Sequence, residues 1–295
     1  MEIQLGPVFA ILTAASFALT QILVRRATYL SEESFTPLAV SMLVGAPIFV
    51  IAVTAAREWE ALRSFTWEQY TLLCAAGLVH LIIARYLFFN STRIIGANPT
   101  AAITRTSVIF SVIMGVVLLG ESVTVQQIFA ALLIMFGAIL TTTEITRTTF
   151  RISTRGLFMG LGTALCAAGS ATLIRPVMAE TDAVYAAALV MYLTAFAIII
   201  VMLITRGQFR ALVMQQSRYT FLMLSAGAVG LVVGHIFRFS ALHLTPVSVA
   251  QPIMATIVIF VLLFSWMVNR RIDVFNWRVI VGIVMVLAGV YFIYG

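Results

Sequence analysis

The sequence predicts an all-α membrane protein with ten transmembrane helices, arranged as two inverted five-helix repeats (5+5). Composition is the first reason: of 295 residues, 62% are hydrophobic and only 10% are charged, whereas soluble domains carry about 25% charged residues. The second reason is that the apolar residues form runs near the ~20 residues needed to span a bilayer. Backbone groups in lipid find no water, so these runs are expected to be helices.

Self-similarity between the two halves is the third reason for this fold. At a spacing of 150 residues Arg25 matches Arg175, and TSVIF at 106–110 matches TIVIF at 256–260, without a gap. Five spans in each half is an odd number, so the second half enters the membrane facing the opposite way. Inverted repeats are typical of secondary transporters, which place their substrate site near the midplane between the repeats.

The ten helices are expected in chain order, at boundaries set by the apolar runs. The first repeat, residues 1–145, holds spans at 5–24, 36–56, 69–90, 96–118 and 125–142; the second, residues 156–295, holds spans at 156–174, 183–204, 219–241, 246–267 and 277–294. Residues 146–155 connect them. The first run has no basic leader and no small-residue cleavage site, so we expect it to be retained as a span.

Proline and glycine mark special places within these helices. Pro99 and Pro252 fall in the fourth and ninth spans, where a proline either frees backbone carbonyls and forms a hinge or makes a passive kink. Two small-xxx-small patterns predict close helix packing: Gly156-xxx-Gly160 and Gly230-xxx-Gly234.

Several function classes are excluded by what the sequence contains. Cys74 and Cys166 lie inside apolar runs and form no CxxC pair, so they are expected to be packing residues rather than a disulfide or metal site. No GxxxxGK[ST] loop, cofactor motif or nucleophile–base set is present, which argues against an ATP-driven pump and against an enzyme. All eighteen lysine-or-arginine positions are arginine; they mark span ends, and the net charge of +7 does not indicate nucleic acid.

The arginines also predict an orientation. Twelve lie in the odd-numbered loops and three on the face that carries the termini, and the positive-inside rule then puts both termini outside the cytoplasm.

Basic residues inside the spans are the candidate substrate contacts. Arg105 is expected about ten residues into the fourth helix, near mid-bilayer, where an arginine costs about 2.5–3.5 kcal/mol and is tolerated when it faces a polar cavity. Arg85 and Arg238 lie nearer helix ends, where snorkelling is the alternative. His80 lies mid-span and could couple transport to protons or simply pack. His235 matches Arg85 in the repeat, so a pseudo-twofold axis would place both on related walls of one cavity.

The spans hold no Asp or Glu at their centres, and unpaired arginines therefore favour a substrate bearing carboxylate, phosphate or sulfonate. Other polar and aromatic side chains are candidates for lining the site, although packing or lipid contact is the alternative for the aromatic ones. The candidate substrate-binding set is Arg105, Arg85, His80, His235, Arg238, Gln21, Tyr86, Ser107 and Gln251; no catalytic or metal-binding residue is expected.

Three segments carry a resemblance to a known family: VVLLGE at 116–121, LLIMFGA at 132–138 and VLAGV at 286–290, together with the 5+5 repeat. The whole chain resembles the EamA family of the drug/metabolite transporter superfamily. The resemblance implies a ten-helix permease with a cavity between the halves that exports or exchanges amino acids, metabolites or drugs. It also implies cytoplasmic termini, contrary to the arginine count.

The sequence as a whole predicts a secondary active transporter in the cell (inner or plasma) membrane that moves a small anionic or zwitterionic organic metabolite by alternating access. Arg105 is expected to meet the anion, with supporting positive potential from Arg85, His235 and Arg238. The alternatives are a flippase for a phosphate-bearing lipid and an exporter of amphiphilic cations. The expected partners are the substrate and the bilayer, without nucleic acid or cofactor. The fused repeat makes a monomer sufficient.

Overall fold

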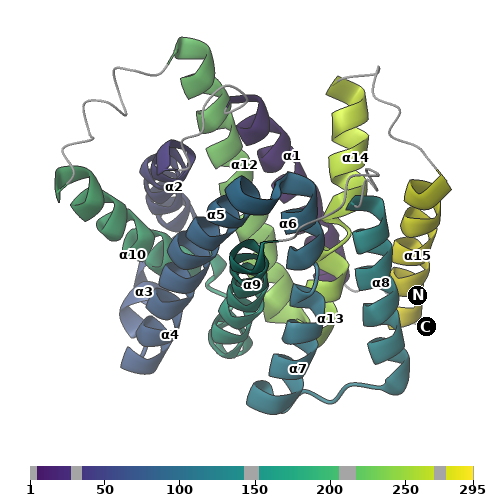
Figure 1. The fold of residues 1–295 in the computed structure, drawn as a ribbon. Helices are drawn as coiled ribbons and strands as arrows, with labels where there is room; N and C mark the ends of the chain where they lie inside the picture. The colour runs from purple at the N-terminus through teal and green to yellow at the C-terminus, as the bar shows by residue number, and fades with distance from the viewer. Residues whose placement is uncertain (1–4, 28–34, 143–152, 206–216, 269–276, 295) are drawn as a thin grey trace.

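The computed structural model describes residues 5–27, 35–142, 153–205, 217–268 and 277–294, and every element in these ranges is a helix (Figure 1). The first repeat contains α1 (Leu5–Ala27), α2 (Phe35–Ala56), α3 (Trp59–Ser64), α4 (Trp67–Gly77), the π-helix η1 (Leu78–Ala84), α5 (Arg85–Ile95), α6 (Ala97–Thr104), α7 (Ser107–Leu119) and α8 (Val125–Thr142). The second contains α9 (Thr154–Glu180), α10 (Val184–Thr205), α12 (Arg218–Leu244), α13 (Val247–Met254), α14 (Ile257–Val268) and α15 (Trp277–Tyr294).

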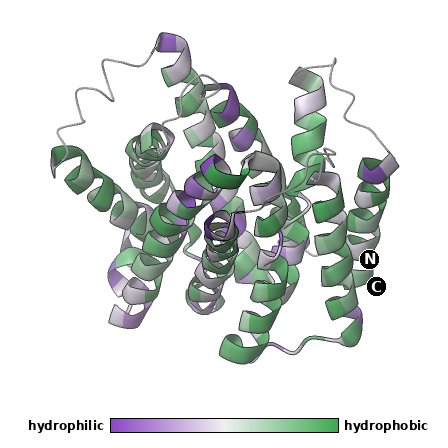
Figure 2. Cartoon of the chain, viewed as in Figure 1, coloured by the Kyte–Doolittle hydropathy of each residue, from purple (hydrophilic) through white to green (hydrophobic). Residues whose placement is uncertain are grey.

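Apolar length makes this a multi-pass membrane protein. Within the described residues, nine helices or continuous helix stacks are long and apolar enough to cross a membrane, and α15 supplies a shorter apolar helix over Trp277–Ile293. Large hydrophobic side chains such as Ile51 and Val117 are exposed on the outside of these helices, as lipid contact requires. The apolar colouring runs along the length of the helices rather than collecting only in their centre (Figure 2). The nine spans lie where the sequence predicts them.

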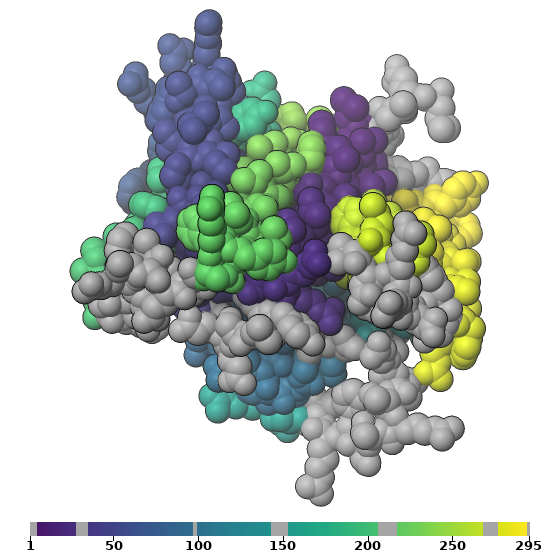
Figure 3. Space-filling view, turned by 90° about the horizontal axis from the view of Figure 1, so that it is seen from above, coloured from purple at the N-terminus to yellow at the C-terminus, as the bar shows by residue number. Residues whose placement is uncertain are grey.

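Helix packing follows the repeat. α1 packs along α12 just as α9 packs along α5, and α1 packs on α14 just as α9 packs on α7. The pairs α2–α10 and α8–α15 each join equivalent helices of the two repeats. From above, α1 and α12 lie side by side in the middle of the molecule, with α15 at its edge (Figure 3). An approximate twofold relation between the repeats therefore governs the whole arrangement.

Glycines let these helices approach closely. A Cβ atom added to Gly156 would lie 2.4 Å from Ile95 of α5, and one added to Gly234 would lie 2.4 Å from the Phe17 ring of α1. The other glycine of each pattern is also crowded, because an added Cβ would lie 2.9 Å from Ile103 at Gly160 and 2.8 Å from Thr20 at Gly230. Both small-xxx-small predictions are confirmed as close helix contacts.

Two spans are interrupted where the sequence predicts single helices. The fourth divides at Arg105–Thr106 into α6 and α7, and the ninth divides at the equivalent Ala255–Thr256 into α13 and α14. At each break a backbone amide donates to the carbonyl three residues earlier instead of four. The Thr106 amide donates to the Ile103 carbonyl (3.0 Å), and the Thr256 amide donates to the Ile253 carbonyl (3.0 Å). Short 3₁₀ turns of this kind often mark hinges. The prediction of one continuous helix at 96–118 and another at 246–267 is therefore wrong, because each span consists of two helices.

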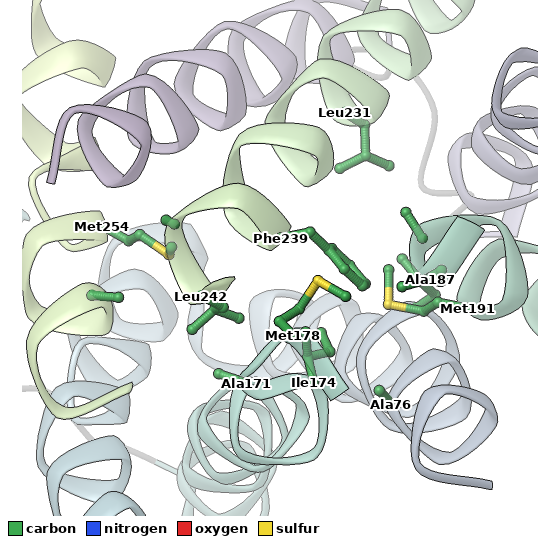
Figure 4. Close-up of a cluster of buried hydrophobic side chains, with 14 of the residues drawn as sticks. Ala76, Ala171, Ile174, Met178, Ala187, Met191, Leu231, Phe239, Leu242 and Met254 are labelled. Atoms are coloured by element: carbon green, nitrogen blue, oxygen red, sulfur yellow. The ribbon is translucent and has the colours of Figure 1, made fainter. Parts of the chain in front are cut away.

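The hydrophobic core consists of buried side chains from helices of both repeats. Buried side chains from α4, α9, α10, α12 and α13 converge in Figure 4, among them Ala76, Met178, Met191, Phe239 and Met254. Met191 directly precedes Tyr192 and Phe239 directly follows Arg238, so α10 and α12 each supply apolar packing and polar groups from one stretch.

Candidate functional site

Four basic side chains converge in the interior of the membrane domain: His80 on η1, Arg85 at the start of α5, and His235 and Arg238 one turn apart on α12. We call these four residues the basic cluster. The His80 and His235 rings meet edge-to-face with their centroids 5.5 Å apart. Both guanidinium groups lie close enough to interact electrostatically with both imidazoles.

Arg238 is buried with unused hydrogen-bonding capacity. Its side chain is 2% exposed, and Nη2 donates to the Ser170 hydroxyl (2.7 Å) and more weakly to the Ala167 carbonyl (3.4 Å) on α9. Its Nη1 is buried and has no partner. The snorkelling alternative for Arg238 is therefore wrong, because the guanidinium points into the protein rather than toward the membrane surface.

His235 lies in an aromatic cage. Its ring centroid is 5.1 Å from that of Phe17 and 5.4 Å from that of Tyr192, and the residue is fully buried. Nδ1 is 3.0 Å from the Tyr192 hydroxyl and 2.9 Å from the Leu231 carbonyl, whereas Nε2 is buried without a partner. The cluster therefore holds a ring nitrogen and a guanidinium nitrogen that both lack a hydrogen-bond partner.

The charge of the cluster is uncompensated. Within the described ranges, no carboxylate interacts with any of its four members; their electrostatic neighbours are one another and Tyr192. A buried charge without a partner is costly. Such residues in membrane proteins usually serve a substrate or ion pathway.

Gln251 lies at the rim of the cluster. Its side-chain amide makes a long hydrogen bond, 3.4 Å, to the Ala167 carbonyl that also accepts from Arg238. Gln251 sits on α13 just before the break that separates this helix from α14. The cluster is therefore connected to the interrupted span of the second repeat.

Other predicted site residues lie elsewhere. Arg105 is at the α6–α7 break, partly exposed, and its buried Nε has no partner; among the described residues nothing joins it to the basic cluster by a hydrogen bond or charge contact. Ser107 begins α7 beside it. Gln21 is exposed on α1, and Tyr86 is 62% exposed on α5. The structure thus brings five predicted site residues together (His80, Arg85, His235, Arg238 and Gln251). The other four predicted residues lie apart from them.

Three contributors escaped the sequence reasoning: Ser170, Tyr192 and Phe17. Ser170 is completely buried, and its hydroxyl lies between Arg238 Nη2 and His80 Nδ1 (3.3 Å). Tyr192 fits against α2 because Gly45 leaves room, with an added Cβ only 2.4 Å from the ring. Hydroxyl groups in the middle of the apolar runs 156–174 and 183–204 were the available signal.

A second polar feature explains the VVLLGE segment. Gly120, at φ +66°, ends α7 in the left-handed conformation that glycine adopts readily. The Glu121 carboxylate then accepts hydrogen bonds from the amides of Val247 (2.7 Å) and Ser248 (2.9 Å) in the first turn of α13. A carboxylate at a helix N-terminus satisfies free N–H groups and complements the helix dipole. This segment therefore links the two repeats.

Further polar contacts cross between the repeats at the same end of the molecule. The Glu58 carboxylate accepts from the Ala186 amide at the start of α10 (2.7 Å), and burial raises the pKa of that carboxyl. The Gln69 amide donates to Glu180 at the end of α9 (2.8 Å). This end of the repeat interface is held by hydrogen bonds, whereas the basic cluster further in has free donors. Among the described residues, no His, Cys, Asp and Glu side chains gather in threes as metal ligands.

Comparisons with known proteins agree with this architecture. The chain matches the EamA-like transporter family over residues 4–143 and again over 154–295, once for each repeat. A solved structure, titled only as the crystal structure of a protein, superposes with a TM-score of 0.79 at 13% identity, covering 99% of this chain and 98% of that one. That likeness shows the fold alone. No curated protein matches. The chain belongs to the EamA-like transporter family and is a multi-pass membrane transporter of the drug/metabolite type.

Proposed function

We propose that the protein is a secondary active carrier for a small anionic or zwitterionic organic metabolite, bound at the basic cluster. One observation carries this proposal: Arg238 is 2% exposed and keeps Nη1 free, and no carboxylate among the described residues interacts with the cluster. A carboxylate, phosphate or sulfonate oxygen would supply the missing acceptor through a charge-assisted hydrogen bond. The neighbouring Phe17 and Tyr192 rings would contact an apolar part of the substrate.

The roles of the arginines differ from the sequence-based hypothesis. Arg238, with Arg85 and His235 beside it, is proposed as the main anion contact in place of Arg105. Arg105 has a partnerless Nε at the α6–α7 break, and we propose it as a second positive position on the substrate path. Ser107, Gln21 and Tyr86 are proposed to line other parts of that path.

Alternating access is proposed to come from rocking of the two repeats, with α15 as the tenth span of an inverted 5+5 arrangement. The equivalent breaks in the fourth and ninth spans would act as hinges. We propose export or exchange in the cell membrane, the habit of the family, with the substrate's own gradient as the driving force. A monomer suffices because one chain holds both repeats, and the arginine count favours termini outside the cytoplasm.

A thermal-unfolding screen of the purified protein tests the substrate class. The panel contains organic anions, zwitterions and amphiphilic cations, and a ligand at 100 times its Kd adds about 2.7 kcal/mol of stability. We expect anions to stabilise the wild type and Arg93→Met, which changes an exposed arginine on α5, but to lose this effect in Arg85→Met. Stabilisation by cations alone would favour the drug-exporter alternative. Stabilisation only by phosphate-bearing lipids would favour the flippase. Equal stabilisation of all three proteins by anions would place the anion site elsewhere.

A further inference from the structure

We propose that the basic cluster binds a proton together with the anion, on the His80–His235 pair, so that the carrier is a proton–anion symporter. This inference rests on the proposed anion site and adds the coupling ion. Its basis is the close approach of two imidazoles between two arginines, with no acidic residue of the described ranges interacting with them.

The helices around the histidine pair contribute positive or neutral groups, and α2, which also packs on α12, has no ionisable side chain. Arg85 comes from α5 and Arg238 from α12; α10 contributes the Tyr192 hydroxyl, and α9 the Ser170 hydroxyl. The Phe17 ring from α1 closes one side, and the Gln251 amide on α13 reaches the same α9 carbonyl as Arg238. Like charges repel strongly in this low-dielectric interior, so a protonated imidazole would be disfavoured while the site is empty.

A bound anion changes that balance. Its negative charge sits among two fixed guanidinium charges and two titratable rings, so its arrival favours a positive imidazole. No described residue supplies negative charge to the cluster, so the substrate has to supply it. Anion binding and proton binding therefore assist each other, and by linkage each raises the affinity for the other to the same extent.

The hydrogen bonds of His235 show where the proton would go. Nδ1 lies 2.9 Å from the Leu231 carbonyl, which can only accept, and 3.0 Å from the Tyr192 hydroxyl, which can accept or donate; the tautomer with the hydrogen on Nδ1 satisfies both contacts. Nε2 is then a bare acceptor, and it is buried without a partner. A proton from water forms an N–H bond at Nε2, and the new N–H donates to the anion beside Arg238 Nη1. The same bond breaks when the anion leaves.

His80 has a comparable arrangement through Ser170. The Ser170 hydroxyl lies 3.3 Å from His80 Nδ1 and 3.0 Å from the Ala167 carbonyl, and it accepts from Arg238 at 2.7 Å. The hydroxyl can donate to a bare Nδ1, or rotate to donate to Ala167 and accept from a protonated Nδ1. Both protonation states of His80 are therefore accommodated by the rotation of one hydroxyl group.

The test uses anions whose own charge is constant: methanesulfonate, benzenesulfonate and sulfate remain ionised across the range in which histidine titrates, about pH 5 to 8. Affinity is measured by calorimetry against pH, and proton uptake by a pH indicator in weakly buffered detergent solution. With the wild type we expect tighter binding as pH falls, approaching tenfold per pH unit for one coupled proton, and uptake of a proton from solution with each anion.

Variants then locate the proton. His80→Gln and His235→Gln are each expected to reduce the dependence on pH, and the double variant to abolish it while binding the anion weakly. Anion binding by the wild type that is independent of pH, without proton uptake, would overturn symport and leave the anion site standing. Unchanged pH dependence in a folded double variant would also overturn it. Failure of all three anions to bind at any pH would overturn the anion site, and this inference with it.

Discussion

Arg238→Met should have opposite effects on stability and on ligand binding. Methionine has a similar length without the charge. In the empty protein the substitution loses the charge-assisted hydrogen bond from Nη2 to Ser170 Oγ at 2.7 Å, worth about 1.5–3 kcal/mol, and the weaker one to the Ala167 carbonyl at 3.4 Å. It also removes a buried charge that has no counter-ion among the described residues, and the desolvation of such a charge costs several kcal/mol. We expect the empty variant to be as stable as the wild type or more stable by about 1–3 kcal/mol.

Ligand binding should change the other way. The anion loses a charge-assisted hydrogen bond from Nη1, again about 1.5–3 kcal/mol, so its Kd should rise about 10- to 150-fold. Thermal unfolding with and without benzenesulfonate measures both quantities in one experiment. Arg218→Met, at the exposed start of the same helix, is the matched control and should change neither. If Arg238→Met unfolds at a lower temperature yet binds the anion as tightly as the wild type, Arg238 is a structural residue and the reasoning is refuted.

Three further predictions concern packing and the repeat interface. Gly137→Ala brings a methyl group within 2.6 Å of an α15 carbonyl and should cost about 1–3 kcal/mol of stability. The control Gly169→Ala meets nothing within 4 Å and should be neutral or stabilising. Equal unfolding temperatures of the two variants would contradict the close α8–α15 contact. Glu121→Gln weakens the cap on α13 and should lower stability by about 0.5–2 kcal/mol relative to the exposed control Glu68→Gln, unless the cap contributes nothing. Because burial raises the pKa of Glu58, the folded state disfavours the ionised form of this carboxyl. Glu58→Gln should therefore stabilise the protein most near neutral pH, and the gain should shrink as the pH falls toward the ordinary pKa of 4.5. A gain in stability that does not vary with pH would contradict this.

The spans were predictable because lipid imposes one rule on every helix. A run of about twenty apolar residues usually spans a membrane. Helices that are equivalent at the 150-residue spacing also pack against one another, as α2 does with α10 and α8 with α15. Pro99 and Pro252 predicted a hinge or a kink in the fourth and ninth spans, but not the positions of the breaks at Arg105 and Ala255, and the π-helix carrying His80 was not predicted. Their hydrogen-bond shifts are small adjustments that neighbouring helices select, and residue type alone does not specify them.

The site was predictable where the repeat placed two basic residues in register. Arg85 and His235 are equivalent positions, and they do meet in one cluster. Arg105 has the uncharged Ala255 as its equivalent, and it stands apart. Ser170 could not be singled out, because a serine hydroxyl in an apolar helix usually bonds to its own backbone, as Ser170 also does to Ala167. Tyr192 could not be singled out, because its position in an apolar run does not distinguish it from a packing aromatic residue. Only the folded arrangement shows that these two bond to Arg238 and His235.

Transport by proteoliposomes tests the central claim most directly. The purified wild type and Arg238→Met are reconstituted separately, and uptake of radiolabelled organic acids, zwitterions and amphiphilic cations is followed across an imposed substrate gradient. The account predicts that at least one carboxylate-, phosphate- or sulfonate-bearing compound enters wild-type vesicles, and that its uptake is largely lost in Arg238→Met. Uptake of cations alone, or equal anion uptake by both proteins, would contradict it.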